Sequence, residues 1–265
     1  GGDAAPGGQE VKDLRTRLED PAVRQVAMRH VPTQGGLVNP AAEVGATCRS
    51  AGVPFLLDAC QSAGQIPLDV DELGCDVLTA TGRKYLRGPR GTGFLFMSGE
   101  LADRLRPASS GGAVWTGPAS YRLPDGAVRF ESYERSIAGV LGLGAAVDYA
   151  LELGLDAIED RVTDLADRLR RGLSGIDGVA VRDLGSQRCG IVTFTVDGVD
   201  PIDVRDSLGG ERVHVWTTGA AFARIDLGSR GIESMVRASA HYVNTNDEID
   251  RTIGLVSDIA VRQGR

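Results

Sequence analysis

"LLDACQSAGQIPLDVDELGCDVLTATGRKYLRGPRGTGFLF", residues 56–96, contains three short apolar runs, and polar residues follow the first two. Asp58 ends the first run, and Lys84 comes shortly after the second. Runs of this length predict buried strands, and open α/β sheets place their ligands at the carboxyl ends of such strands. The stretch therefore predicts a sheet that brings Asp58 and Lys84 to a common site.

Apolar runs and helical patterns alternate on both sides of this stretch. Mostly buried strands are predicted at residues 24–31, 54–60, 76–82 and 91–97. A helix is predicted at residues 40–52, because Pro40 and Gly52 are typical of the two ends of a helix. This alternation predicts an α/β fold with a mainly parallel sheet in a large domain at residues 1–154.

The rest of the chain predicts a second, smaller domain. A Gly-, Pro- and Ser-rich stretch at residues 106–126 is predicted to be a long irregular segment. Beyond it, helices are expected at residues 134–154, 156–175, 200–210 and 246–263, and strands at residues 189–198, 212–219 and 235–244. We therefore predict an α+β domain at residues 155–265.

Composition narrows the classes of function. The net charge of -7 and the pI near 5.1 argue against nucleic acid as a partner, because such binders usually carry a basic patch. No apolar run approaches the roughly 18 residues of a membrane span, and no signal-peptide core is found, so we expect no membrane partner and a cytoplasmic location. The four cysteines lie far apart without a C-x-x-C pair, so neither a metal site nor a disulfide framework is predicted.

The residues around Lys84 suit pyridoxal 5′-phosphate (PLP). This cofactor needs a lysine for its Schiff base and an acid, here Asp58, that keeps its pyridine nitrogen protonated. Gln61 can donate to the phenolate oxygen of the ring. Thr81 and Arg83 can bind the phosphate, because the fork of an arginine makes charge-assisted bonds to two oxygens.

The same stretch resembles the cofactor segment of class V aminotransferase-like enzymes. This fold-type I PLP-dependent group includes cysteine desulfurases, selenocysteine lyases and cysteine C–S lyases. Its D-x-x-Q pattern, its later Ser or Thr and its Schiff-base lysine match Asp58, Gln61, Thr81 and Lys84. Arg83 stands where desulfurases usually carry histidine, a departure that still suits a phosphate.

Two further segments carry the resemblance along the chain. "RHVPTQGGLVNP" (29–40) resembles the segment near the phenolate side of the ring, with Thr33 in place of the asparagine common in desulfurases. "MVRASAHYVNTNDEID" (235–250) is similar to the family signature whose arginine, here Arg237, is expected to bind the substrate α-carboxylate. The resemblance implies a fold-type I transferase fold, with the N-terminal part of the large domain missing, and a homodimer.

The resemblance leaves the reaction open. A desulfurase of this type carries a mobile-loop cysteine before its carboxylate-binding arginine, and residues 213–237 contain none. We therefore predict β-elimination at the Cβ–S bond of an S-substituted cysteine (a conjugate, sulfoxide or thiocysteine), which releases a sulfur product, pyruvate and ammonia. A class V aminotransferase, an epimerase or a cysteine desulfurase is the alternative. A scaffold protein without turnover would not need Lys84.

Overall fold

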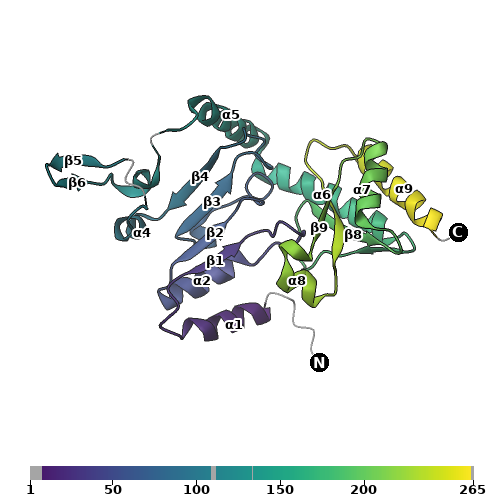
Figure 1. Ribbon diagram of the computed structural model, residues 1–265, viewed down its shortest axis with the longest axis horizontal. Helices are drawn as coiled ribbons and strands as arrows, with labels where there is room; N and C mark the ends of the chain where they lie inside the picture. The colour runs from purple at the N-terminus through teal and green to yellow at the C-terminus, as the bar shows by residue number, and fades with distance from the viewer. Residues whose placement is uncertain (1–7, 109–111, 133, 264–265) are drawn as a thin grey trace. The chain divides into compact units, whose positions relative to one another are not determined.

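The structure, a computed structural model, describes residues 8–108, 112–132 and 134–263 (Figure 1). They form two compact units. The first unit comprises residues 1–30, 40–64 and 68–152, and the second comprises residues 31–39, 65–67 and 153–265. The second unit therefore takes two short segments from the N-terminal part of the chain, and Thr33 lies on the longer of them.

The first unit is built on a four-stranded sheet in the order β1-β2-β3-β4. Its strands are β1 (Val26–Arg29), β2 (Phe55–Asp58), β3 (Val77–Thr81) and β4 (Gly93–Met97). The first three strands run parallel, and β4 pairs antiparallel with β3. The predicted strands and the mainly parallel sheet are thus confirmed. The prediction of a mostly buried fourth strand is wrong, because β4 lies at the edge of the sheet and exposes Phe94 and Leu95.

Helices pack on this sheet and complete an apolar core. They are α1 (Gly8–Leu18), α2 (Ala41–Ala51) and the short α3 (Val70–Leu73). As predicted, α2 follows Pro40 and ends at Gly52, whose φ of 66° suits glycine. Phe55 and Leu57 are fully buried in the core of this unit. Burial of each such side chain contributes about 2 kcal/mol, so the core fixes the direction in which β2 ends.

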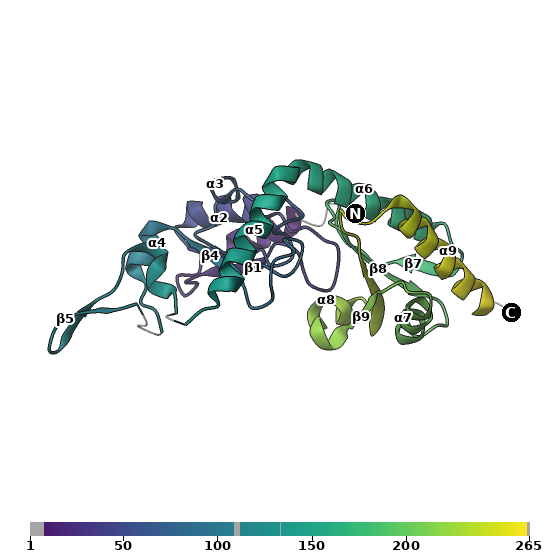
Figure 2. The same cartoon turned by 90° about the horizontal axis from the view of Figure 1, so that it is seen from above.

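The first unit continues with α4 (Gly99–Arg104), the strands β5 (Val114–Gly117) and β6 (Ser120–Arg122), the 3-10 helix η1 (Gly126–Phe130) and α5 (Ile137–Leu153). The irregular segment predicted at residues 106–126 is therefore wrong in part, and its residues 109–111 lie outside the described residues. Strands β5 and β6 form a hairpin that extends away from the sheet (Figures 1 and 2). An edge-on contact between the rings of Trp115 and Tyr121, with centroids 6.1 Å apart, links its two strands.

The second unit contains an antiparallel sheet in the order β7-β8-β10-β9. Its elements are α6 (Leu155–Ser174), β7 (Val179–Val181), β8 (Ile191–Val196), α7 (Pro201–Gly210), β9 (Trp216–Gly219), the 3-10 helix η2 (Ala220–Phe222), α8 (Arg224–Ser229), β10 (Ser234–Ser239) and α9 (Asn246–Gln263). Side chains from α6, β8 and α9, among them Leu169, Phe194 and Val256, share one buried core. The predicted α+β character is confirmed, whereas β7 and α8 were not predicted.

Membrane-spanning potential is weak in the described part of the chain. No single helix there is both long and apolar enough to cross a bilayer. Only α5 and α6, taken together as a bent pair, pass the same test of length and composition.

Candidate active site

Asp58 and Lys84 follow neighbouring parallel strands of the first unit. Asp58 is the last residue of β2, and its carbonyl accepts a hydrogen bond from His30 N at 2.9 Å, at the end of β1. Lys84 lies in the turn after β3 and accepts a hydrogen bond from Arg87 N at 2.9 Å. Both residues are half-buried. The sheet therefore presents a carboxylate and an amine at the ends of adjacent strands, as the sequence predicted for one edge.

The turn that carries Lys84 is closed by close backbone approach. Gly88 N donates to Gly82 O at 2.7 Å, and Gly82 N donates to Thr92 O at 2.9 Å. A Cβ at position 82 would lie 2.4 Å from the hydroxyl oxygen of Thr92, so only glycine fits there without displacing its neighbour. The glycines around Lys84 thus set the path of the turn and hold the lysine near the strand end.

The thiol of Cys60 lies where the predicted residues meet. Burial raises the pKa of this thiol, and a hydrogen bond to Asp58 and the charge of Asp58 raise it further. The charge of Lys84 and a hydrogen bond with the backbone of Thr81 act in the opposite direction. The same thiol interacts with Asp58, Thr81 and Lys84, so these three residues lie close together.

Cys60 is not among the site residues that the sequence predicted. The side chain is only partly buried, and its backbone N donates to Asp58 Oδ1 at 2.9 Å. This bond holds the carboxylate close to its own strand end. The D-A-C-Q order was the available signal, since a residue two positions after an aspartate commonly donates to its side chain.

The other predicted residues of the first unit differ in burial. Gln61 is buried, with 5% of its surface exposed, whereas Arg83 is exposed. The hydroxyl of Thr81 donates to Thr92 O at 3.4 Å, across the antiparallel pair β3–β4. A carboxylate at the end of β2, with a hydroxyl, an exposed guanidinium and an amine at and after the end of β3, makes up the set of groups that PLP requires, so the residues present fit this cofactor. Their individual roles stay predictions.

Lys84 has a compositional signal that the sequence prediction did not use. The chain holds 29 lysines and arginines, yet only two of them, Lys12 and Lys84, are lysines. Arginine cannot lose its proton in proteins and so cannot serve as an amine nucleophile. In a chain that uses arginine almost everywhere, a lysine at a strand end indicates a position where a removable proton matters.

The predicted substrate residue lies in the second unit. Arg237, on β10, is opposite Thr193 of β8 and Trp216 of β9. Its Nε donates to Thr33 O at 2.8 Å, and its Nη1 donates to Ser239 Oγ at 3.0 Å. These bonds fix the plane of the guanidinium. Thr33 was predicted from its side chain, and no pattern in the sequence indicated that its carbonyl would accept a hydrogen bond from Arg237.

His30 is a buried histidine beside Asp58. Burial lowers the pKa of His30 to about 4, so its ring is neutral at pH 7. Its Nδ1 is buried and has no hydrogen-bond partner among the described residues. His30 is therefore packed inside the first unit as a neutral ring.

Comparisons with known proteins agree with this geometry. The family profile described as Aminotransferase class-V matches residues 4–252. A probable cysteine desulfurase of Methanothermobacter thermautotrophicus (strain Delta H) is 32% identical over 246 residues, which cover 91% of this chain and 62% of that protein. The chain therefore spans less than two thirds of the length of this relative.

Solved structures give the same result. An apo cysteine desulfurase from Thermococcus onnurineus NA1 superposes with a TM-score of 0.89 at 28% identity, covering 98% of this chain and 65% of that one. The cystine C–S lyase C-DES, solved with its reaction product cysteine persulfide, superposes with a TM-score of 0.80 at 26% identity, covering 94% and 64%. Another structure of C-DES carries glycine covalently linked to its PLP cofactor. These superpositions confirm the predicted fold.

Proposed function

This chain belongs to the class V aminotransferase family, and we propose that it is a PLP-dependent carbon–sulfur lyase. Its substrate is an S-substituted cysteine, and it cleaves the Cβ–S bond by β-elimination to a free sulfur product, pyruvate and ammonia. The names of its relatives, cysteine desulfurases and a cystine C–S lyase, support carbon–sulfur chemistry. They leave two fates for the sulfur: transfer to the protein or release.

The state of the thiols is the observation that favours release. Burial raises the pKa of all four cysteines, which are Cys48, Cys60, Cys75 and Cys189. The thiolate is the nucleophile, so a raised pKa leaves little reactive sulfur at neutral pH. Residues 213–237, before the carboxylate-binding arginine, contain no cysteine. The chain thus has no cysteine in the segment where a desulfurase of this type carries its sulfur acceptor, and burial favours the protonated form of the thiols that it has.

Three residues of this chain have separate roles in the proposed elimination. PLP, when bound, supplies an electron sink for the charge that develops at the substrate Cα. Asp58 keeps the ring nitrogen protonated, and Arg237 binds the α-carboxylate. Lys84 takes the proton from Cα. The electron pair of the broken C–H bond then forms the Cα–Cβ double bond, and the Cβ–S bond breaks with its electrons on sulfur. Water hydrolyses the released 2-aminoacrylate to pyruvate and ammonia. A thiol or persulfide of low pKa makes a good leaving group.

The phosphate is assigned to residues of the turn after β3. Arg83 is exposed, so its guanidinium can reach a phosphate without a cost of desolvation beforehand. The hydroxyl of Thr81 and the buried side chain of Gln61 complete the cofactor contacts that we propose, and Thr33 lies on the ring side. These assignments rest on the match between the sequence and the family pattern.

We also propose a homodimer. The first unit exposes large apolar side chains, which include Phe94, Leu95, Trp115, Tyr121, Ile137, Leu141 and Leu151. Large apolar side chains left exposed to water are common at interaction sites. Light scattering of the active, cofactor-loaded protein should give twice the mass of the chain, and a fully active monomer would contradict the proposal. A cytoplasmic location stays a prediction.

One assay separates the candidate reactions. The loaded protein is incubated with L-cystine and, separately, with L-cysteine, whose free thiol a desulfurase requires, in the absence of a keto-acid acceptor. Pyruvate, alanine, protein-bound sulfur and pyridoxamine phosphate are measured in both reactions. Elimination gives pyruvate in proportion to the sulfur released. Alanine with sulfur bound to the protein would instead establish a desulfurase, which the names of the relatives keep as the second candidate. Pyridoxamine phosphate without pyruvate would establish an aminotransferase.

A further inference from the structure

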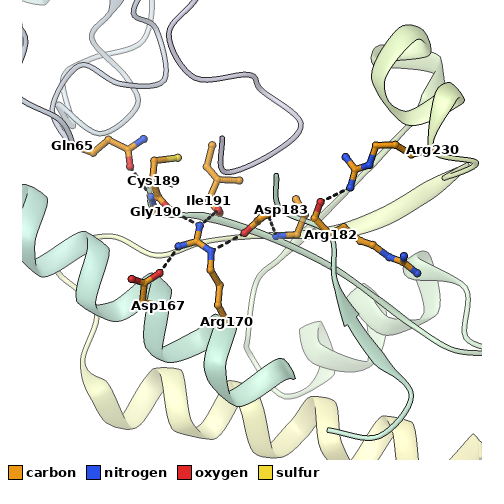
Figure 3. Close-up of polar contacts among 10 residues, drawn as sticks. Gln65, Asp167, Arg170, Arg182, Asp183, Cys189, Gly190, Ile191 and Arg230 are labelled. Carbon is orange, nitrogen blue, oxygen red and sulfur yellow. Dashed lines mark hydrogen bonds and ion pairs between the residues drawn. The ribbon is translucent and has the colours of Figure 1, made fainter. Parts of the chain in front are cut away.

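Arg170 of α6 is a buried cation that donates four hydrogen bonds (Figure 3). Its Nε donates to Asp183 Oδ2 at 2.8 Å, and its Nη1 donates to Asp167 Oδ1 at 2.9 Å. Its Nη2 donates to the carbonyls of Cys189 and Ile191, each at 2.7 Å. The Asp183 side chain is fully buried. A charge buried so deeply is stable only when hydrogen bonds of good geometry satisfy it. Because two of these bonds go to the carbonyls of Cys189 and Ile191, Arg170 fixes the backbone at the start of β8.

The backbone that Arg170 fixes carries the inserted segment 31–39. Cys189 N donates to Gly36 O at 2.8 Å, and Val38 N donates to Gln187 O at 3.0 Å. The fit is tight, because a Cβ at position 36 would lie 2.2 Å from Ile191 O and 2.7 Å from Arg170 Nη2. The segment therefore rests directly on the carbonyl and the guanidinium of this cluster.

Two short routes lead from Arg170 to Arg237. In the first, the segment seated at Gly36 presents the carbonyl of Thr33, which accepts a hydrogen bond from Arg237 Nε at 2.8 Å. In the second, Asp183 Oδ1 accepts hydrogen bonds from Thr193 N at 3.0 Å and from Thr193 Oγ1 at 2.6 Å. Thr193 is the residue of β8 opposite Arg237. One buried cluster thus supports both the strand behind Arg237 and the carbonyl beside its guanidinium.

We propose that Arg170 is a positioning residue for substrate binding. It holds segment 31–39 and β8 so that the guanidinium of Arg237 keeps the orientation in which it receives the substrate α-carboxylate. This inference rests on the proposed function only for the role of Arg237. A purely structural role for Arg170 would lower thermal stability and leave the affinity of the folded protein for a carboxylate unchanged.

Two adjacent glycines provide the test variant and its control. Gly36→Ala places a methyl group against Ile191 O and Arg170, whereas a Cβ at position 35 meets nothing within 4 Å. We expect Gly36→Ala to raise KM for L-cystine by about tenfold or more, with a smaller change in kcat, because a small displacement of a binding group has an effect of this order. Gly35→Ala should behave as the unaltered protein.

A second pair of variants changes the arginine itself. Arg170→Lys keeps the charge but loses the planar fork, so it cannot serve two carbonyls and two carboxylates together. It should raise KM in the same way as Gly36→Ala. Arg168→Lys is the matched control on the same helix, since Arg168 pairs with Asp250 in a half-exposed ion pair. Amide hydrogen exchange should show faster exchange at Cys189 and Val38 in both test variants and not in the controls.

The outcomes separate this inference from the proposed function. If Arg237→Lys itself leaves KM unchanged, the proposed role of Arg237 is wrong and the inference is overturned with it. If Arg237→Lys raises KM while folded Gly36→Ala and Arg170→Lys do not, only the positioning role is overturned. Support requires a raised KM in both variants, and no further rise when Gly36→Ala is added to Arg237→Lys.

Discussion

The candidate site residues fall into two groups, a first part in the first unit and a second part in the second unit, and each group is held in a different way. Asp58 and Lys84 follow strands that are neighbours in both sequence and space, and the turn after β3 holds the lysine by its own backbone bonds. Arg237 instead depends on the carbonyl of Thr33, which lies 204 positions away in the chain. The first part needs only one sheet and one turn, whereas the second needs an inserted segment and a buried arginine to seat it. Substitutions should therefore disturb the first part only when they lie in its own strands or turn. The second part should also be disturbed by substitutions far away in the sequence.

Lys84→Ala should have the largest effect, because nothing else in the first part can replace an amine. We expect loss of the cofactor absorbance that borohydride reduces and loss of at least about 10⁴-fold in turnover. Lys12→Ala, at the only other lysine, is the control and should retain both. Peptide mapping after borohydride reduction should find the covalently attached cofactor on Lys84. A Lys84→Ala protein that still carries a reducible cofactor and keeps near-normal turnover would contradict the assignment.

Asp58→Ala should rank second. Removing the carboxylate withdraws support from the protonated ring nitrogen, and we expect a loss of about 10³-fold in the rate of Cα proton removal, or about 4 kcal/mol. Cofactor binding through the lysine should persist. Single-turnover kinetics with an α-deuterated substrate measure the step. Asp76→Asn is a useful control, since Asp76 Oδ2 accepts a hydrogen bond from Phe55 N at the opposite end of β2. Unchanged kinetics in Asp58→Ala would show that the two strand ends do not act together.

His30 should make the stability of the first unit depend on pH. Burial lowers its pKa to about 4 from the ordinary value of 6.5, so the unfolded chain binds the proton more readily than the folded one. This contribution is fully present above pH 6.5 and is lost as pH falls towards 4. The loss should reach about 3 kcal/mol, at about 1.4 kcal/mol per unit of pKa. Urea unfolding across this range measures it. His30→Leu should flatten the profile, and an equal slope in both proteins would rule out His30 as its source.

Arg237→Lys should have the smallest effect of the four and should sharpen the contrast between the two parts. A lysine keeps the charge but loses the bidentate fork, so KM should rise by about tenfold to thirtyfold, or about 2 kcal/mol. The absorbance of the resting, cofactor-loaded protein should not change, since the proposed partner of Arg237 is the substrate carboxylate and not the cofactor. Titration of that absorbance with L-cystine measures the affinity. A variant that altered the resting spectrum and left KM unchanged would contradict the division of roles.

The sequence predicted that Asp58 and Lys84 follow neighbouring parallel strands, and physics explains why, while their roles stay predictions. Strand ends can be found from apolar runs, and parallel neighbours bring their ends to one edge, so the spacing of Asp58 and Lys84 was informative. The hydrogen bond from Cys60 N to Asp58 Oδ1 joins residues two positions apart and could have been predicted from the order of residues. It was missed because no role was assigned to this cysteine. The edge position of β4 was not accessible, because apolar content does not say which strand lacks a neighbour.

The second part could not be predicted in the same way. Arg237 was found from a resemblance, but its partner is a backbone carbonyl, and every residue has one. Arg170 stands among other arginines of α6, and only its place beside the buried stripe of Leu169 and Leu173 distinguishes it. Its partner Asp183 follows β7, a strand of three residues too short to leave a pattern. Contacts of this kind are set by tertiary packing and have no local periodicity.

The two inserted segments have a consequence for protein engineering. Because residues 31–39 and 65–67 belong with residues 153–265, the chain passes between the two units five times. A fragment of residues 153–265 would lack Gly36 O, which binds Cys189 N, and Gln65 Oε1, which binds Gly190 N at 3.0 Å. The second unit is therefore not a module that can be excised or transplanted at one junction. Chimaeras of this chain should exchange both inserted segments together with everything after residue 152.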